Sequence, residues 1–446
     1  MSVQFGHRVH RALRQSATVN LIVELAQTTE STLESIKESA FSSREAKLQS
    51  VTDKLQAQNK VAAAEITKVL SKETTGLHSG FKNFWISNVV YIEDASFELV
   101  EKLAGLASVG TIREQKLIKI DNPKPLKELV GQEWGVKKIS APNVWADGNI
   151  GQGVIVSSLD TGVRGTHEAL YRNFRGAYGW YDPELKTDVP NDPAGHGTHT
   201  MGTIAGAKGY GVAPGATWMS CKMSLDADGN IVESNIIDCA QWIICPTDTQ
   251  GNNPDCTKAP HVVNNSWGGP GGDNWFKSAV DAWVKAGIVP VFSSGNSGPD
   301  CGTAGSPGDY PNVIGVGATD SNDLLAYFSS VGPTVAGRRK PDISAPGFYI
   351  KSSVPDSDTS YDVYSGTSMA APHVTGAIAL LLSAQPDLAI DEVKVALYTT
   401  TDQKGLGATN HTCGGTSDLV WPNNQYGHGR LNVLNAYEGF RPAPTN

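Results

Sequence analysis

The segment GVIVSSLD (residues 153–160) is a short apolar strand that ends on a carboxylate, and it decides the fold of the larger part of the chain. Strand-like and helix-like segments alternate after it: TWMSCKM (217–223), ESNIIDCAQWII (233–244), HVVNNSW (261–267), FKSAVDAWVKAG (276–287), IVPVFSSGN (288–296) and VIGVGAT (313–319). Short apolar strands separated by helices indicate a parallel sheet covered on both faces. The sequence therefore predicts an α/β fold from about residue 136 onward.

Polar side chains follow two of these strands at their carboxyl ends, the edge at which ligands bind in parallel sheets. Asp160 ends the first strand and precedes Thr161 and Gly162, although a turn-forming Asp before Gly is the alternative interpretation. Asn296 follows a later strand, and its amide could donate a hydrogen bond to a developing oxyanion. Taken alone, the GNSG around Asn296 is only a loop.

A candidate histidine lies in GHGTHTMGTIAG (195–206). The glycines on either side of His196 let the backbone turn tightly, and the small residues after it suit a helix packed against the sheet. His199 is the competing candidate on the same segment. His167, in DTGVRGTHEAL (160–170), is expected to pack near the Asp160 loop rather than to catalyse.

A candidate serine lies in YSGTSMAAPHVTG (364–376), just before a long apolar run. If the helix begins at about Thr367, Ser368 sits in its first turn, where the helix dipole and free backbone N–H groups favour negative charge. We expect Pro372 to be tolerated so near a helix start. Ser365 is interpreted as a loop or capping residue.

Composition limits the partners and the compartment. The chain has 446 residues and a net charge of −9, with no basic stripe, so nucleic acid is not an expected partner. The apolar runs are too short to span a bilayer, and the start of the sequence shows no visible export signal. Six cysteines permit three disulfides in fifteen connectivities, which would suit an oxidising compartment; buried free thiols are the alternative. Cys245 and Cys256, which flank a polar loop, are the pair we expect first.

The composition changes at DNPKPLKELVGQEWG (121–135), where we place a domain boundary. Five segments before it read as strand, helix, strand, helix and strand: VNLIVEL (19–25), residues 43–72, FWISNVVYI (84–92), SFELVEKLAGLA (96–107) with Ser96 as cap, and VGTIREQKLIKI (109–120). They predict a small α+β unit of ferredoxin-like order over residues 19–120, after a poorly ordered N-terminus at 1–18. This unit contains no cluster of catalytic residue types.

Several blocks together resemble a known family. LDTGVRGTHEAL, GHGTHTMGTIAG and GTSMAAPHVTG, in this order, resemble the three catalytic blocks of the subtilisin family of serine endopeptidases. NNSWGG and SSGNSG resemble its substrate-strand and oxyanion blocks, and GHGRLNVLNA resembles its closing helix, so the resemblance covers roughly residues 136–437. The N-terminal unit resembles the inhibitory propeptide of the family. SAPNVW and the long apolar helix are most similar to its bacillopeptidase-F-type branch.

The resemblance implies a subtilisin-like three-layer αβα fold with a mostly parallel central sheet, and a serine endopeptidase made as a self-processing zymogen. Ser368 would be the nucleophile, His196 the general base and then acid, and Asp160 the group that orients the imidazole. The chain order Asp, His, Ser is that of subtilisin. Asn296 would share the oxyanion with the backbone N–H of Ser368.

The resemblance also implies a site for polypeptide substrates. The backbone of VNNSWGG (263–269) would bind an extended peptide. The pocket for the residue before the scissile bond would be shaped by Ser266, Trp267, Gly268 and Gly305. No charged residue occurs in these segments, which favours neutral or apolar side chains in that pocket.

The expected roles of the parts follow from the same resemblance. Residues 19–120 would be an intramolecular inhibitor, 121–135 a linker with the cleavage between about Ile120 and Gly135, and 136–446 the catalytic domain. No cofactor or metal is expected in catalysis, although structural calcium is common in the family. Asp226, Asp228 and Asn230 alternate like the start of a calcium loop, with a solvated turn as the alternative. We expect a secreted monomer with no membrane partner.

Two other functions fit less well. A catalytically silent relative that acts as a binding or regulatory protein needs a damaged constellation, whereas Asp160, His196, Ser368 and Asn296 are all present. An esterase of the α/β-hydrolase type needs a G-x-S-x-G elbow and the order Ser, Asp, His, and neither fits Ser368.

Overall fold

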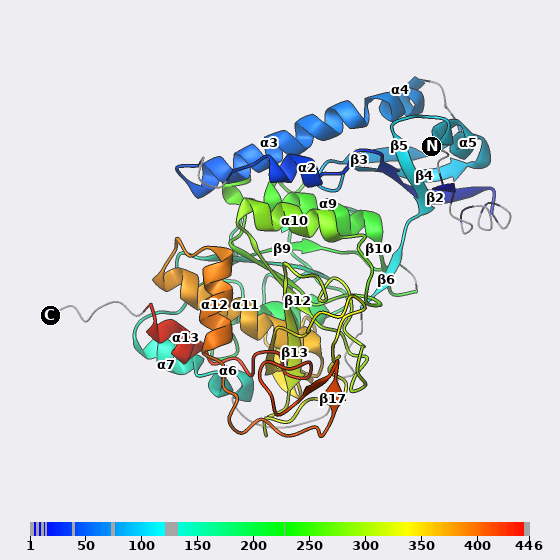
Figure 1. Ribbon diagram of the computed structural model, residues 1–446. Coiled ribbons are helices and arrows are strands. Elements are labelled where there is room, and N and C mark those ends of the chain that lie inside the picture. The colour runs from blue at the N-terminus through cyan, green and yellow to red at the C-terminus, as the bar shows by residue number, and fades with distance from the viewer. Residues whose placement is uncertain are drawn as a thin grey trace.

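The computed structural model describes residues 4–5, 9, 13, 16–37, 41–72, 76–120, 133–226 and 228–440. Its larger part is built on a seven-stranded sheet in the order β14-β13-β12-β11-β7-β9-β8, in which every pairing is parallel (Figure 1). In that order the strands are Ile343–Pro346, Ile314–Thr319, Val289–Ser293, Val262–Asn265, Ile155–Asp160, Thr217–Lys222 and Trp180–Tyr181. The predicted parallel sheet is confirmed.

Helices cover both faces of this sheet, because alternate strand residues point to opposite sides. Val262 packs in the cluster of helices α8 (His196–Ala205) and α11 (Thr367–Ala384), while its neighbour Val263 packs in the cluster of α9 (Glu233–Ile244) and α10 (Lys277–Ala286). The helices α6 (Trp134–Lys138), α7 (Ala141–Ala146), α12 (Ile390–Thr399) and α13 (Val433–Glu438) belong to the first side. The three-layer α/β architecture is as expected.

Helix α11 is long and apolar enough to cross a membrane by length and composition, but 89% of it is buried inside the fold. It runs through the centre of one layer and contacts β11, β12, β13 and β14. Its apolar character is that of a core helix.

The N-terminal unit has its own sheet, in the order β1-β5-β2-β4-β3, with strands Gln4–Phe5, Val109–Glu114, Thr18–Leu25, Val89–Ser96 and Gly80–Phe84. The last four of these form the ferredoxin-like arrangement. The helices are α2 (Glu30–Glu34), α3 (Arg44–Ala62), α4 (Ala64–Lys72) and α5 (Phe97–Ala104), and Ser96 caps α5 by accepting from the Leu99 N–H at 3.3 Å.

Two predicted strands of this unit were wrong in extent. FWISNVVYI is not one strand, because the chain turns at residues 85–88, where Asn88 has a positive φ of 52°, and it forms the hairpin β3–β4. VGTIREQKLIKI also divides. After β5 the chain leaves the sheet, and β6 (Leu117–Lys119) pairs antiparallel with β10 (Asn230–Val232) of the larger part.

The predicted helix at 43–72 is interrupted at Ala63, and its two pieces pack on different cores. Leu48, Val51 and Leu55 of α3 are fully buried in the cluster that contains α9 and α10 together with Ile22 and Phe84, and α3 lies against α10 (Figure 1). Ile66 of α4 packs instead in the unit's own core. The first piece is therefore an arm that attaches the N-terminal unit to the larger part.

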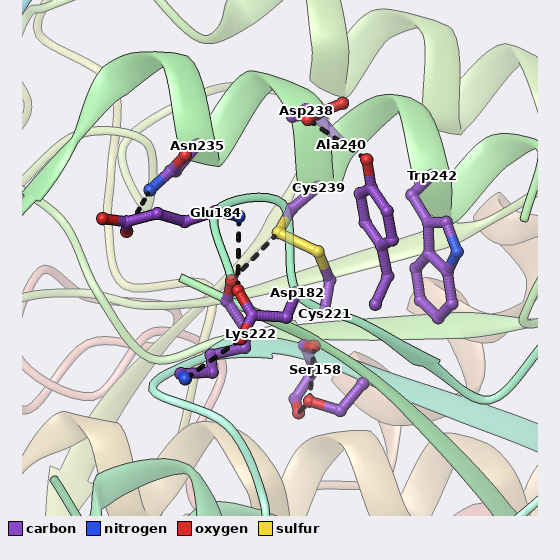
Figure 2. Close-up of a disulfide and its surroundings, with 12 residues drawn as sticks. Ser158, Asp182, Glu184, Cys221, Lys222, Asn235, Asp238, Cys239, Ala240 and Trp242 are labelled. Atoms are coloured by element: carbon purple, nitrogen blue, oxygen red, sulfur yellow. Dashed lines mark hydrogen bonds and ion pairs between the residues drawn. A yellow bond between two sulfur atoms is a disulfide. The ribbon is translucent and has the colours of Figure 1, made fainter. Parts of the chain in front are cut away.

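All six cysteines are paired: Cys221–Cys239, Cys245–Cys256 and Cys301–Cys413. The pair expected first is confirmed. Figure 2 shows the Cys221–Cys239 bond joining the end of β9 to α9, close to a buried ion pair between Lys222 and Asp182 (3.1 Å). The predicted linker and cleavage region at 121–135 lies outside the described residues up to residue 132, as does most of 1–18.

Candidate active site

The carboxylate at the end of β7 and the imidazole at the start of α8 are hydrogen-bonded. His196 Nδ1 donates to Asp160 Oδ1 at 2.7 Å, and both side chains are completely buried. Asp160 also accepts from the Thr161 N–H (2.8 Å) and the Thr200 hydroxyl (3.1 Å). A carboxylate that accepts from Nδ1 fixes the tautomer of the neutral ring, so that Nε2 is an acceptor.

Ser368 lies in the first turn of α11, and this helix begins at Thr367 as predicted. Ser368 Oγ donates to the Ser266 carbonyl at 3.1 Å, and Ser266 Oγ donates to the Ser368 carbonyl at 2.8 Å. Ser266 follows β11, whose Asn265 is paired in register with Leu159, so Ser266 continues opposite Asp160. Asp160 at the end of β7 and Ser266 just after β11 thus lie side by side at one edge of the sheet, and Ser266 is hydrogen-bonded there to Ser368 at the start of α11.

Pro372 lies inside α11 rather than at its very start, which corrects the reason given for its tolerance. A helix residue at this position normally donates its N–H to the carbonyl four residues earlier, here that of Ser368, but proline has no N–H. The Ser266 hydroxyl satisfies that carbonyl instead. The Ser266 hydroxyl therefore replaces the hydrogen bond that Pro372 cannot donate.

Asn296 has a fixed amide orientation. Its Oδ1 accepts from the Thr367 N–H and the Thr367 hydroxyl, each at 2.9 Å, so Nδ2 points the other way. A Cβ built on Gly366 would lie 3.6 Å from Asn296 Nδ2 and 3.6 Å from the Ser368 nitrogen. Two N–H donors therefore flank one small space that the glycine leaves open.

The four predicted pocket residues, Ser266, Trp267, Gly268 and Gly305, line one cavity of about 490 Å³. Ser368 and Asn296 line it too. Among its lining residues the single charged one is Lys119, which belongs to β6 of the N-terminal unit. Sequence reasoning missed the approach of β6, because nothing in KLIKI indicates that this segment pairs outside its own sheet.

The competing candidates have structural surroundings. His199 Nε2 bonds to the Ile350 carbonyl (3.0 Å), its ring stacks on Tyr364, and burial lowers its pKa to about 3. His167 Nε2 bonds to the Ser360 carbonyl at 2.8 Å. Ser365 Oγ accepts from the Tyr349 N–H at 2.9 Å, in agreement with a loop role.

The suspected calcium loop is a closed turn. Asp226 Oδ1 accepts from the N–H groups of Asp228 (2.9 Å) and Asn230 (2.8 Å), so the carboxylate binds its own loop. Among the residues that the structure describes, no group of three or more His, Cys, Asp or Glu side chains could hold a metal ion. The loop itself therefore does not offer a converging set of ligands.

Residues 151–416 match the sequence profile of the subtilase family, and the chain belongs to that family. Over 387 residues it is 38% identical to bacillopeptidase F of Bacillus subtilis (strain 168). The aligned region is 79% of this chain and 26% of that protein. It is 37% identical over 278 residues to subtilisin NAT of Bacillus subtilis subsp. natto (61% of this chain, 66% of that protein) and to a subtilisin of Bacillus pumilus (61% and 92%). The chain therefore spans about a quarter of the length of bacillopeptidase F.

Proposed function

We propose that the protein is a serine endopeptidase in which Asp160, His196 and Ser368 form the catalytic triad. The observation that carries the proposal is the buried 2.7 Å hydrogen bond from His196 to Asp160 at the end of β7, beside Ser266 of the neighbouring strand end, to whose carbonyl Ser368 is hydrogen-bonded. Membership of the subtilase family supports the same assignment. The reaction is hydrolysis of a peptide bond through an acyl-enzyme.

Each residue has one task in this reaction. Ser368 Oγ attacks the carbonyl carbon while its proton passes to His196 Nε2. Asp160 keeps the ring in the correct tautomer and stabilises the imidazolium. His196 then gives the proton to the leaving amine, and a water molecule activated in the same way releases the acid product and regenerates Ser368.

The oxyanion of the tetrahedral intermediate would accept from Asn296 Nδ2 and the Ser368 N–H. This is supported by the orientation of the amide and by the open space beside Gly366. The substrate residue before the scissile bond would enter the 490 Å³ cavity, with a preference for neutral or apolar side chains because its lining in the larger part has no charge.

We further propose that residues 19–120 inhibit the enzyme until they are released. The support is a strand of that unit beside the pocket: Ile118 and Ile120 are buried, and Lys119 lines the cavity next to Ser368. The chain that follows would reach the active site and be cut there by the enzyme itself. We place this cleavage between about Ile120 and Gly135.

The proposal also covers the compartment and the oligomeric state. Three disulfides favour an oxidising compartment, and hence a secreted protein. The enzyme would work as a monomer on polypeptides without a catalytic cofactor, and any calcium would be structural.

Labelling with a fluorophosphonate probe tests the nucleophile. Protein freed of its N-terminal unit should incorporate one equivalent of the probe at Ser368, while Ser365→Ala, a loop variant, labels equally. If the isolated catalytic part does not label although it is folded, the enzyme proposal is wrong.

Processing provides a second test. Ser368→Ala, expressed in a protease-free host, should remain one band of about 47 kDa, close to the 47.3 kDa of the intact chain. A processed product from this variant would mean that another protease makes the cut.

A further inference from the structure

Asp192 is a buried carboxylate that takes no part in the chemistry proposed above. It lies four residues before His196 in the loop that leads into α8, and only 7% of it is exposed. Its Oδ1 accepts from the Thr161 hydroxyl (2.8 Å) and from the N–H groups of residues 194 and 195 (3.2 and 2.8 Å). Its Oδ2 accepts from the Thr198 N–H (2.8 Å) and hydroxyl (2.6 Å).

These contacts join the loop that bears His196 to the loop that bears Asp160. Thr161 follows Asp160, and its hydroxyl accepts from the Gly197 N–H at 2.9 Å while it donates to Asp192. The Thr198 hydroxyl accepts from the Arg164 N–H at 3.0 Å while it also donates to Asp192. Each threonine therefore reaches across to the opposite loop, and one carboxylate binds both.

The two loops touch through their backbones at this place. A Cβ on Gly197 would lie 2.1 Å from the Gly162 carbonyl oxygen, and a Cβ on Gly162, whose φ is +111°, would lie 2.0 Å from the Asn191 carbonyl oxygen. Such distances exclude any side chain. The relative position of the two loops is therefore set by close backbone contact and by the hydrogen bonds that Asp192 accepts from Thr161 and Thr198.

Hydrogen bonds rather than a counter-ion accompany this carboxylate. Burial raises the pKa of Asp192, and the hydrogen bonds from Thr198, Gly195 and Thr161 oppose that shift. Burial raises the pKa of Tyr364 on β16 (Tyr361–Tyr364), and the charges of Asp362 and Asp192 add to that shift. No ion pair of Asp192 occurs among the residues that the structure describes.

We propose that Asp192 is a positioning residue, which fixes the His196 loop against the Asp160 loop so that the acid–imidazole hydrogen bond is set before substrate binds. The inference rests on the proposed function, since it assigns Asp192 to the same site. An ordinary capping role for α8 is the competing explanation, and the two differ in what they predict for turnover.

Asp192→Asn in the full chain, allowed to process, is the test. Asparagine keeps the shape but has one oxygen acceptor and brings an NH₂ group against existing donors, so at least two of the five hydrogen bonds are lost. We expect kcat to fall about 10- to 100-fold, the scale of a small misplacement of catalytic groups, with KM within about twofold. A role in capping alone would lower the melting temperature and leave kcat unchanged.

The pH profile is a readout that loss of stability does not move. The titratable neighbours of His196 within the described residues include Asp160 on β7, which is hydrogen-bonded to it, and His199 on α8, whose pKa burial lowers and the charge of His196 lowers further. A looser contact with the Asp160 carboxylate lowers the pKa of the imidazole, so the acid limb of kcat/KM should move to lower pH in Asp192→Asn. An unchanged acid limb together with unchanged kcat would overturn the inference.

A pair of variants at Thr161 decides the case if Asp192→Asn does not fold. Thr161→Ser keeps the hydroxyl that joins Gly197 to Asp192, whereas Thr161→Val removes it with little change in shape. Activity and acid limb of the serine variant should lie close to those of the unaltered enzyme, and those of the valine variant should move in the direction of Asp192→Asn. Equal behaviour of the two variants contradicts the inference.

Proton NMR separates the inference from the proposed function. The proton between His196 Nδ1 and Asp160 can be observed in Ser368→Ala protein without turnover, and its downfield resonance should shift or broaden when Asp192→Asn is added. If the protein proves to have no peptidase activity, this comparison still decides whether Asp192 sets the pair. If activity is present and both kinetics and resonance are unaffected, the inference fails while the proposed function stands.

Discussion

Glu233, the first residue of α9, accepts hydrogen bonds from both terminal nitrogens of Arg113 in the N-terminal unit: Nη1 donates to Oε2 at 2.7 Å and Nη2 to Oε1 at 2.6 Å. The Glu233 side chain is fully buried, and it also accepts from the Lys116 N–H at 2.8 Å. Burial alone would lower the pKa of Arg113, but its hydrogen bonds and ion pairs with Glu233 and Glu24 leave that pKa above its usual value. The guanidinium thus stays charged, and this ion pair attaches the N-terminal unit to the start of a helix of the larger part.

Arg113→Ala should weaken the hold of the N-terminal unit on the catalytic part. Removal of one partner leaves the Glu233 carboxylate buried and partly unsatisfied, a loss of about 2–5 kcal/mol in comparable interfaces. The measurement is the inhibition constant of the released unit against the processed enzyme. Lys102→Ala is the control, because among the described residues Lys102 forms its ion pair with the exposed Glu98 of its own helix, and its loss should leave that constant unchanged.

Ser266→Ala should reduce kcat, because the Ser368 carbonyl then loses its donor and Pro372 cannot replace it. A buried acceptor left without a partner costs about 1–3 kcal/mol, so a fall of about tenfold is expected. Adding Pro372→Ala restores an N–H four residues after Ser368 and should recover part of the loss. Steady-state measurement of kcat for the single and double variants tests this prediction. If the double variant recovers no activity, Pro372 and Ser266 are not coupled in this way.

Asn296→Ala should lower kcat by about 10²–10³ with little change in KM, a magnitude known from a subtilisin. The amide also holds the first residue of α11 through Thr367, so loss of order in the helix start is the competing cause. Thr367→Val separates the two, since it removes one contact to Oδ1 and keeps Nδ2. A comparable loss in both variants would argue against an oxyanion role for Nδ2.

Glu133 should make stability depend on pH. Burial raises its pKa to about 7, although its carboxylate accepts from the Gly135 N–H (2.9 Å) and the Lys351 N–H (2.8 Å). A carboxyl group whose folded pKa lies above its unfolded value stabilises the fold at low pH, and that contribution is lost as pH rises from about 4.5 toward 7 and above. Relative to Glu133→Gln, the unaltered chain should lose about 3 kcal/mol over this range.

Urea unfolding of Ser368→Ala protein at pH 4.5 and pH 8, with and without Glu133→Gln, measures that loss. Glu98→Gln, at an exposed position, is the matched control and should leave the pH dependence as it is. Parallel stability curves for the unaltered and Glu133→Gln chains would contradict the prediction.

In the larger part, the sequence alone placed Asp160 at the end of β7 and Asn296 shortly after β12, because apolar runs followed by polar residues are local signals. It also predicted the start of α11 at Thr367, where glycine and small residues precede an apolar run. Contacts between distant segments were not accessible in this way. Asp192 is unremarkable in PNDPAGHG, and its importance is visible only when Thr161 and Thr198 are brought to it.

The errors have local physical causes. The turn that divides FWISNVVYI depends on the positive φ of Asn88. Apolar residues stand before and after the Ser87–Asn88 pair, so the whole segment resembles one strand. The last predicted strand of the N-terminal unit divides because its second piece, Leu117–Lys119, pairs with β10 of the larger part instead of with its own sheet. The role of Pro372 was misjudged because the hydroxyl that compensates it comes from Ser266, about a hundred residues earlier.

The break between α3 and α4 also bears on what happens after the cut. Leu48, Val51 and Leu55 lie in the buried cluster that holds α9 and α10 together with Ile22 and Phe84 of the N-terminal unit, and outside the cluster that holds α4. If the proposed cleavage separates the two parts, this face loses the cover given by the larger part, and full burial of each such side chain is worth about 1.5–3 kcal/mol. The released unit would then be less stable than in the intact chain and more open to digestion by the enzyme, so release would tend to run in one direction.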